Sequence, residues 1–213
     1  MKSACFTGHR NLNCDLEDLK SRLYNVLERA IVNAKITEFY NGGAIGWDML
    51  TAQTVLQLRE KYPHIRLNMI LPCSPESQSY KWTSEQKKAY FSILKQADSI
   101  EQIADHYFDG CMKQRNARLV ELSDCCFCYW NGNLKSGTSQ TIRMVKRKHI
   151  LIVNFYHNFD SSGVKVRQQE PKSSNLLVFG FSQNNQFNEM KFFLRCYIIE
   201  ILYFSFFYYK RFF

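Results

Sequence analysis

The apolar residues in the first 154 positions follow two alternating spacings. Short apolar runs such as Leu67–Leu71 and Ile150–Val153 lack the alternation of apolar and polar residues, as expected for strands that are buried on both faces of a sheet. The longer segment Asp15–Ala34 repeats its apolar residues every three or four positions, which predicts an amphipathic helix. Strand-like runs that alternate with helices in this way predict βαβ units and a parallel sheet.

The same patterns assign the rest of this region. Strands are predicted at Ser3–Thr7, Thr37–Tyr40, Ile65–Leu71, Ser99–Ile103, Cys125–Trp130 and His149–Asn154. Helices are predicted at Asp15–Ala34, Trp47–Lys61, Gly110–Leu122, Thr138–Lys148 and from Thr83 onward. Thr83 and Gln86 form a capping-box pattern, and residues 72–81 are predicted to form a polar loop. We therefore expect an α/β fold, with a Rossmann-like, doubly wound, mostly parallel sheet in a three-layer α/β/α arrangement.

The composition changes after Asn154. The stretch Ser161–Asn175 is polar and aperiodic, which is typical of a linker, and twelve of the seventeen phenylalanines fall in residues 155–213. We therefore expect a domain at 1–154, a linker at 155–175 and an aromatic-rich tail at 176–213.

The most apolar part of the tail, Phe192–Tyr209, is a weak candidate for a membrane segment. Arg195 and Glu200 interrupt it, and each charge costs roughly 2.5–3.5 kcal/mol near the centre of a bilayer. Membrane insertion is therefore disfavoured. Packing of the tail on the domain, or a tail without a defined structure, are the alternatives.

Charge and cysteine content narrow the functional class. A net charge of +9 favours solubility and affinity for anions, without pointing to nucleic acid in particular. No secretory signal is visible among the first residues, so we expect a cytoplasmic protein whose eight cysteines are reduced. Cys125 and Cys128 form an isolated C-x-x-C with no second pair at zinc spacing, and we expect no metal site.

Three glycine-containing turns follow predicted strands. Because ligands of open parallel sheets bind at the carboxyl ends of the strands, these turns are candidates for holding a phosphate group. Their candidate residues are Gly8, His9 and Arg10 in the first turn, Gly42, Gly43, Gly46 and Asp48 in the second, and Asn131, Gly132, Ser136, Gly137 and Thr138 in the third.

Other polar residues have both a functional and a structural interpretation. Arg115 and Asn116 could reach the same edge of the sheet, where a guanidinium suits a phosphate or ribose, or they could lie on a solvated helix face. Asp48 could accept hydrogen bonds from ribose hydroxyls or simply favour the first turn of its helix. Trp82 could cover the binding cleft or only pack. The basic cluster of Arg143, Lys146, Arg147 and Lys148 is best explained as complementing a helix C-terminus, with a nucleic-acid patch as the less favoured alternative.

Five motifs of the first domain occur together in a recognisable order. They are Thr7-Gly8-His9-Arg10, Gly42-Gly43-x-x-Gly46-x-Asp48, Pro72-Cys73 with Gln78 and Trp82, Tyr107-x-x-Gly110-Cys111-Met112-x-x-Arg115-Asn116, and Asn131-Gly132 before Gly137-Thr138. This pattern resembles the YpsA-type branch of the SLOG superfamily over about residues 3–154. The resemblance implies a Rossmann-like fold and the binding of a nucleotide or a nucleotide-derived ligand, such as ADP-ribose or an NAD-like molecule.

The superfamily also contains LOG phosphoribohydrolases, and the chain departs from their motif. Those enzymes carry a catalytic glutamate three residues after the threonine of a Gly-Thr pair, whereas Thr141 stands at that place here, beside Gln140. Neither residue can supply the carboxylate that an oxocarbenium-like transition state requires. We therefore expect a module that binds or senses a nucleotide. The alternatives are a nucleotide N-glycoside hydrolase that uses another acid, such as Asp48, and a single-stranded DNA-binding module like the relative DprA. Protein partners are a further expectation.

Overall fold

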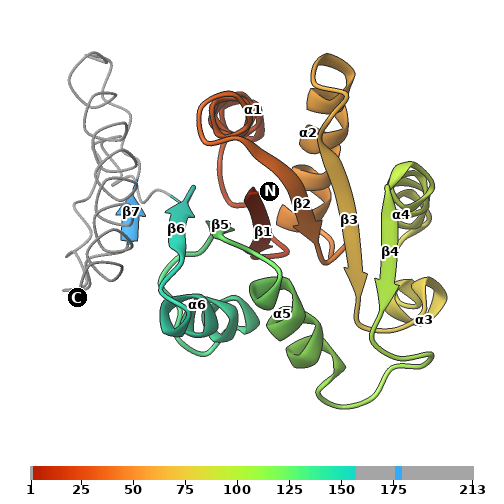
Figure 1. Cartoon of the computed structure of the whole chain (residues 1–213). Helices are drawn as coiled ribbons and strands as arrows, with labels where there is room; N and C mark the ends of the chain where they lie inside the picture. Colours follow the sequence, from red (N-terminus) through yellow and green to blue (C-terminus); the bar gives the residue numbers. More distant parts are fainter. Residues whose placement is uncertain (1, 157–175, 179–213) are drawn as a thin grey trace, which may run out of the picture. The chain divides into compact units, whose positions relative to one another are not determined.

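A parallel β-sheet forms the centre of the described part of the chain, which comprises residues 2–156 and 176–178 of a computed structural model. Every pair of neighbouring strands is parallel, and the order is β4-β3-β2-β1-β5-β6-β7. The strands are β1 (Lys2–Gly8), β2 (Ile36–Asn41), β3 (Arg66–Leu71), β4 (Ser99–Gln102), β5 (Cys125–Tyr129), β6 (Leu151–Asn154) and β7 (Leu176–Val178). In Figure 1 the arrows of β3 and β6 point in different directions because the twist between neighbouring strands accumulates across the sheet.

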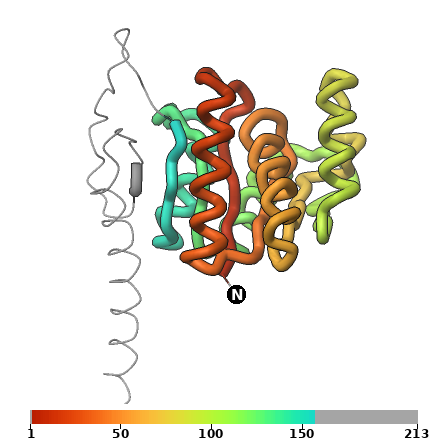
Figure 2. Tube along the Cα trace, turned by 90° about the horizontal axis from the view of Figure 1, so that it is seen from above, coloured from red at the N-terminus to blue at the C-terminus, as the bar shows by residue number. Residues whose placement is uncertain are grey.

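Helices cover both faces of this sheet. They are α1 (Leu16–Val32), α2 (Trp47–Lys61), α3 (Pro75–Ser79), α4 (Ser84–Gln96), α5 (Cys111–Glu121) and α6 (Gly137–Arg147). The apolar residues of α1, α2 and α4 form one buried cluster with the sheet, and those of α5 and α6 form another. Figure 2 shows α1 and α2 side by side on their face. The predicted Rossmann-like, three-layer α/β fold is therefore confirmed.

The strand β5 shows why the sequence of a central strand is apolar without alternation. Phe127 and Tyr129 belong to the cluster under α1 and α2, whereas Cys126 and Cys128 belong to the cluster under α5 and α6. Successive side chains point to opposite faces, and both faces are buried. Cys125 and Cys128 consequently lie on opposite faces of the sheet, so their C-x-x-C spacing does not bring the two thiols together.

Cys5, Cys14, Cys73, Cys111, Cys126 and Cys128 are free thiols, and all of the described cysteines are buried except Cys14. Cys5 and Cys126 are partners in the β1–β5 register, and burial together with this contact raises the pKa of Cys126. Among the described residues, no group of three or more His, Cys, Asp or Glu side chains is arranged to hold a metal ion.

The structure corrects the predicted loop at 72–81, which contains the short helix α3. Ser74 precedes this helix as its N-cap, and its hydroxyl accepts a hydrogen bond from the Ser77 N–H at 3.3 Å. Pro75 occupies the first helical position, where its missing N–H costs nothing. The predicted capping box of Thr83 and Gln86 is present at the start of α4.

The described domain continues past Asn154. The Phe155 N–H donates to the Cys128 carbonyl oxygen at 2.8 Å, and its buried ring lies 5.1 Å from the Trp47 ring. Beyond it, β7 pairs with β6 through Ile152 and Leu176. The segment Phe192–Tyr209 lies outside the described residues, and no helix within them is long and apolar enough to cross a membrane.

We expect the substitution Phe155→Ala to lower the free energy of unfolding by about 3–5 kcal/mol, because it empties a buried aromatic site between Trp47 and Phe127. Urea unfolding of the full chain measures this change. Leu134→Ala is the control, because Leu134 is 70% exposed and its loss should change stability by less than about 0.5 kcal/mol. Equal stabilities of the two variants would contradict the packing of Phe155 in the core.

Candidate functional site

The order of the strands reverses between β1 and β5. From β1 the chain adds β2, β3 and β4 on one side, and then returns to place β5 and β6 on the other. In open α/β sheets this reversal opens a crevice at the carboxyl ends of the two central strands. The loops that flank it here are those after β1 and β5, which contain the first and third glycine turns. All three predicted turns follow parallel strands and therefore lie at the same edge of the sheet.

The glycines of the first two turns make room for the protein's own side chains and backbone. A Cβ atom on Gly8 would lie 2.5 Å from the Trp47 side chain, and one on Gly46 would lie 2.1 Å from the Arg10 carbonyl oxygen. A Cβ atom on Gly42 would lie 1.2 Å from Arg115 Nη1. Gly43 has a φ of +66°, which favours glycine. These four positions therefore have a packing role whatever ligand the edge binds.

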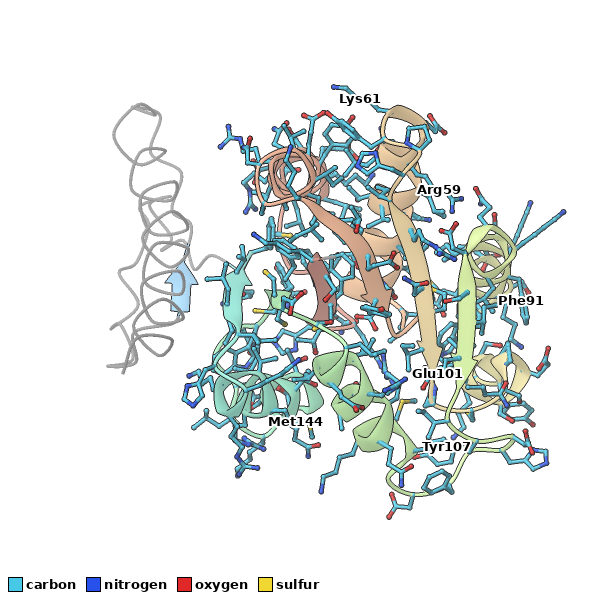
Figure 3. All side chains as sticks on the ribbon, viewed as in Figure 1. Arg59, Lys61, Phe91, Glu101, Tyr107 and Met144 are labelled. Atoms are coloured by element: carbon cyan, nitrogen blue, oxygen red, sulfur yellow. The ribbon has the colours of Figure 1, made fainter. Side chains whose placement is uncertain are left out.

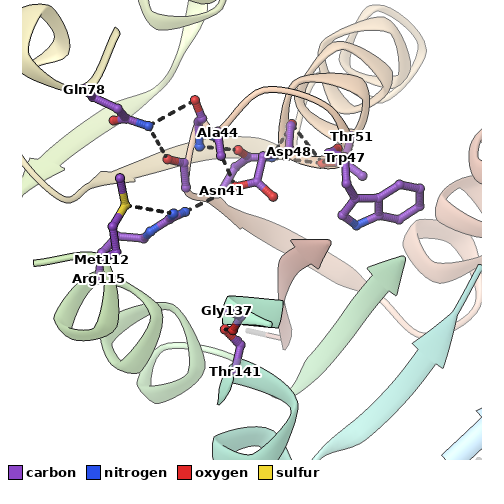
Figure 4. Close-up of polar contacts among 12 residues, drawn as sticks. Asn41, Ala44, Trp47, Asp48, Thr51, Gln78, Met112, Arg115, Gly137 and Thr141 are labelled. Carbon is purple, nitrogen blue, oxygen red and sulfur yellow. Dashed lines mark hydrogen bonds and ion pairs between the residues drawn. The ribbon is translucent and has the colours of Figure 1, made fainter. Parts of the chain in front are cut away.

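Asp48 and Arg115 form a buried ion pair beside Gly42. Arg115 Nη1 lies 3.2 Å from Asp48 Oδ2, and the two side chains are only 7% and 5% exposed. The Ala44 N–H donates to the same carboxylate oxygen at 3.2 Å (Figure 4). Burial raises the pKa of Asp48, and the nearby Arg115 guanidinium partly offsets this. The interpretation of Arg115 as part of a solvated helix face is wrong, because the side chain is buried.

The guanidinium of Arg115 is not fully satisfied. Its Nη2 lies 3.8 Å from Met112 Sδ, and its buried Nε has no hydrogen-bond partner among the described residues. A buried donor without a partner is costly, and few such groups occur in folded proteins. Asn116, the next residue, is half-buried on α5.

Gln78 is a key residue of the edge, although the sequence patterns did not predict it as a site residue. Its amide nitrogen donates to the carbonyl oxygens of Gly42 at 3.2 Å and Gly43 at 3.1 Å. Its amide oxygen accepts from the Tyr90 hydroxyl at 3.0 Å, and burial raises the pKa of Tyr90, which keeps this donor protonated. Gln78 thus fastens α3 to the second glycine turn. Its place in the Pro72-Cys73 motif was the only signal in the sequence.

The third turn differs from the other two because its glycines face open space. Among the described residues, no atom lies within 4 Å of a Cβ built on Gly132 or Gly137, apart from their chain neighbours and the backbone of α6 itself. Ser136 caps α6, accepting from the Ser139 N–H at 3.1 Å. His9 joins this turn to the first one: its Nε2 accepts from the Asn131 N–H at 3.1 Å and lies 2.9 Å from the Asn131 side-chain oxygen. Thr138 is buried in the first turn of α6.

Thr141 is fully buried and donates its hydroxyl to the Gly137 carbonyl oxygen at 3.2 Å (Figure 4). The position that holds glutamate in LOG hydrolases is therefore occupied by a hydroxyl engaged within α6. Within the basic cluster, Lys148 donates to three carbonyl oxygens at the end of α5, those of Val120, Glu121 and Ser123. Its charge complements a helix C-terminus, although that of α5 and not of its own helix.

A cavity of about 710 Å³ opens beside α3, and we call it the α3 groove. Its lining includes the predicted site residue Arg10 and also Trp82, which lies edge-on to Tyr90 at 5.1 Å. Trp82 therefore both packs and borders a cavity. The full lining is Arg10, Glu76, Ser77, Gln78, Tyr80, Lys81, Trp82, Tyr107 and Met112.

These features define a Rossmann-like α/β protein with a buried ion pair and glycine turns at the crevice of its sheet. The model of the YspA SLOG family matches residues 5–156, and the chain belongs to that family. The match confirms the resemblance seen in the motifs.

Relatives of the chain are bacterial proteins. The SPbeta prophage-derived protein YoqJ of Bacillus subtilis (strain 168) is 26% identical over 144 residues, which cover 62% of this chain and 82% of YoqJ. A UPF0398 protein of Halalkalibacterium halodurans is 24% identical over 121 residues, 56% of this chain and 63% of that protein. A solved structure, that of TM1055, aligns with a TM-score of 0.45 and 15% identity over 72% of this chain and 73% of its own.

The contrast between the two kinds of glycine can be tested. We expect Gly42→Ala to lower the free energy of unfolding by about 3–5 kcal/mol, because its Cβ displaces the Arg115 guanidinium and leaves Asp48 as an unpaired buried charge. Gly137→Ala is the matched control and should be neutral or slightly stabilising, because its Cβ enters open space in a helix. Similar losses for both variants, measured by urea unfolding, would show that Arg115 does not fill the space above Gly42.

The raised pKa of Asp48 predicts a specific pH dependence. The folded protein holds this proton more tightly than the unfolded chain, in which the group has its ordinary pKa of 3.8. The contribution of Asp48 to stability is therefore complete below pH 3.8 and is lost as the pH rises through the folded pKa. A difference of one pH unit between the pKa values of a group in the folded and unfolded states changes the free energy of unfolding by about 1.4 kcal/mol.

We expect the stability of the natural chain relative to Asp48→Asn to be greater at pH 4 than at pH 7, because asparagine cannot titrate. Urea unfolding of both proteins at the two pH values measures this difference. A relative stability that instead increased with pH would mean that the attraction of Arg115 outweighs the burial of the carboxylate.

Proposed function

We propose that the protein binds or senses a nucleotide or nucleotide-derived ligand at the carboxyl edge of its sheet. The observation that carries this proposal is the third glycine turn, at the point where the strand order reverses. Gly132 and Gly137 leave open space there, and α6 begins at Gly137 with its amide groups directed outward from the helix end. A helix N-terminus with room for close approach suits a phosphate group.

Arg115 supports the same placement. Its guanidinium lies at this edge beside Gly42, and its positive charge would attract a bound anion. His9 joins the first and third turns, so a ligand at the crevice would meet both loops. Membership of the SLOG family agrees with a nucleotide-related role. ADP-ribose and NAD-like molecules belong to the same class of ligand.

Binding is favoured over N-glycoside hydrolysis. Thr141 is turned into α6, and the carboxylate of Asp48 is held by Arg115 and the Ala44 N–H. A carboxylate fixed in this way is poorly placed to act on a substrate. Single-stranded DNA binding has less support, since Lys148 and Arg143 of the basic cluster bond to backbone and side-chain oxygens of the protein itself. A cytoplasmic location and protein partners are part of the proposal.

We expect nucleoside monophosphates, ADP-ribose or NAD to raise the thermal stability of the full chain, by about 2.7 kcal/mol when the ligand is at 100 times its dissociation constant. Gly137→Asp should weaken this binding at least about tenfold. Its carboxylate favours the helix N-terminus of the folded protein but repels a phosphate there.

Ser84→Asp, which places the same charge at the start of α4, is the matched control and should leave the affinity unchanged. Thermal shift and calorimetric titration of the three proteins provide the readout. The proposal fails if none of these ligands stabilises the chain, or if both aspartate variants weaken binding equally.

A further inference from the structure

We propose that the α3 groove is the subsite for the nucleobase, which stacks there on exposed aromatic rings while the phosphate lies at the third glycine turn. This inference rests on the proposed function and assigns the ligand class as a nucleoside phosphate with a free base. The groove has a volume of about 710 Å³, within the range of roughly 300–1,000 Å³ that small-molecule sites occupy.

The aromatic residues of the groove are unusually exposed for their size. Tyr80 is 78% exposed and Tyr107 is 59% exposed, and both line the cavity together with Trp82. Figure 3 shows Tyr107 projecting from the loop between β4 and α5. Each aromatic ring offers a flat apolar face, and stacking of a base on such a face contributes about 1–3 kcal/mol.

The floor of the groove is fixed by contacts within the protein. Gln78 lines the groove, but its amide already bonds to Gly42, Gly43 and the Tyr90 hydroxyl. Trp82 is held against Tyr90 by an edge-to-face contact at 5.1 Å and by a backbone hydrogen bond to Ser79. Trp82 is therefore positioned before any ligand arrives, which reduces the entropy that is lost on binding.

The charge of the groove suits an anionic ligand. Arg10 and Lys81 line it from two different loops, and Glu76 is the one acidic side chain among the described residues of the lining. A nucleoside phosphate would be attracted by this excess of positive charge. An uncharged aromatic ligand would gain nothing from it.

The loop after β1 connects the groove with the proposed phosphate site. Arg10 lines the groove, and the preceding residue, His9, contacts Asn131 of the third turn. Met112 also lines the groove and contacts Arg115 behind it. One ligand can therefore place its base against α3 and extend along this loop toward α6.

Three probes separate the two ends of the ligand: adenosine 5′-monophosphate, adenosine and ribose 5-phosphate. We expect Tyr107→Ala to weaken the binding of adenosine 5′-monophosphate and adenosine by at least about fivefold, because a stacking partner is lost. The affinity for ribose 5-phosphate should not change. Gly137→Asp should weaken the binding of adenosine 5′-monophosphate and ribose 5-phosphate and leave the affinity for adenosine unchanged.

Phe108→Ala is the matched control, because Phe108 lies beside Tyr107 on the same loop but does not line the groove. Calorimetric titration of the full chain measures the dissociation constants. Quenching of tryptophan fluorescence by adenosine, reduced in Trp82→Phe, reports stacking in the groove independently.

The outcomes distinguish the base subsite from the proposed function. If adenosine 5′-monophosphate binds and responds to Gly137→Asp but not to Tyr107→Ala, the base subsite is wrong and the proposed function stands. If Tyr107→Ala and Phe108→Ala weaken binding equally, the effect belongs to the loop and the base subsite is again wrong. Failure of the chain to bind any of the three probes overturns the base subsite, and the proposed function is overturned as well only if ADP-ribose and NAD also fail to bind.

Discussion

The buried ion pair between Asp48 and Arg115 is the interaction on which the carboxyl edge of the sheet depends. Asp48 belongs to the first turn of α2, on one face of the sheet, and Arg115 belongs to α5, on the other. Withdrawing two charges from water costs several kcal/mol for each ion, so the pair is tolerable only with close geometry and added hydrogen bonds. Gly42 supplies the space and the Ala44 N–H supplies the hydrogen bond. The pair therefore fixes the second turn and both helix layers relative to one another.

A chain of contacts extends this fixed unit to α3. The Gln78 amide nitrogen donates hydrogen bonds to the carbonyl oxygens of Gly42 and Gly43. Its amide oxygen accepts a hydrogen bond from the hydroxyl of Tyr90 in α4. A five-residue helix has little stability of its own, since most helical stability comes from packing. Its position is consequently set by the glycine turn that the ion pair holds. The wall of the α3 groove therefore depends on a charge pair that is itself hidden from solvent.

The sequence predicts the sheet well because both faces of its central strands are buried. A largely apolar run such as Leu67–Leu71 indicates this burial. It misses α3 because five residues are too few to show a helical period, and only the Ser74-Pro75 pair marks its start. The glycine patterns predict turns but not what fills the space beside them. Gly42 and Gly137 both lie in glycine-containing turns that follow strands. The space beside Gly42 is filled because Arg115 packs against it, whereas the space beside Gly137 is open. That contact arises from packing between residues far apart in the chain, which local sequence does not encode.

The loop after β1 connects the packed second glycine turn with the open third glycine turn. On one side the Arg10 carbonyl lies against Gly46, and the Trp47 N–H donates to the His9 carbonyl oxygen at 3.2 Å. On the other side, His9 contacts Asn131 of the open third turn. The loop is thus held by its backbone on one side and by the His9 imidazole on the other, while the Arg10 side chain is exposed at the groove. Because the packed glycines keep this loop in place, it sets the separation between the open third turn and the α3 groove. For the proposed ligand, a rigid separation of this kind would select by length as well as by chemistry.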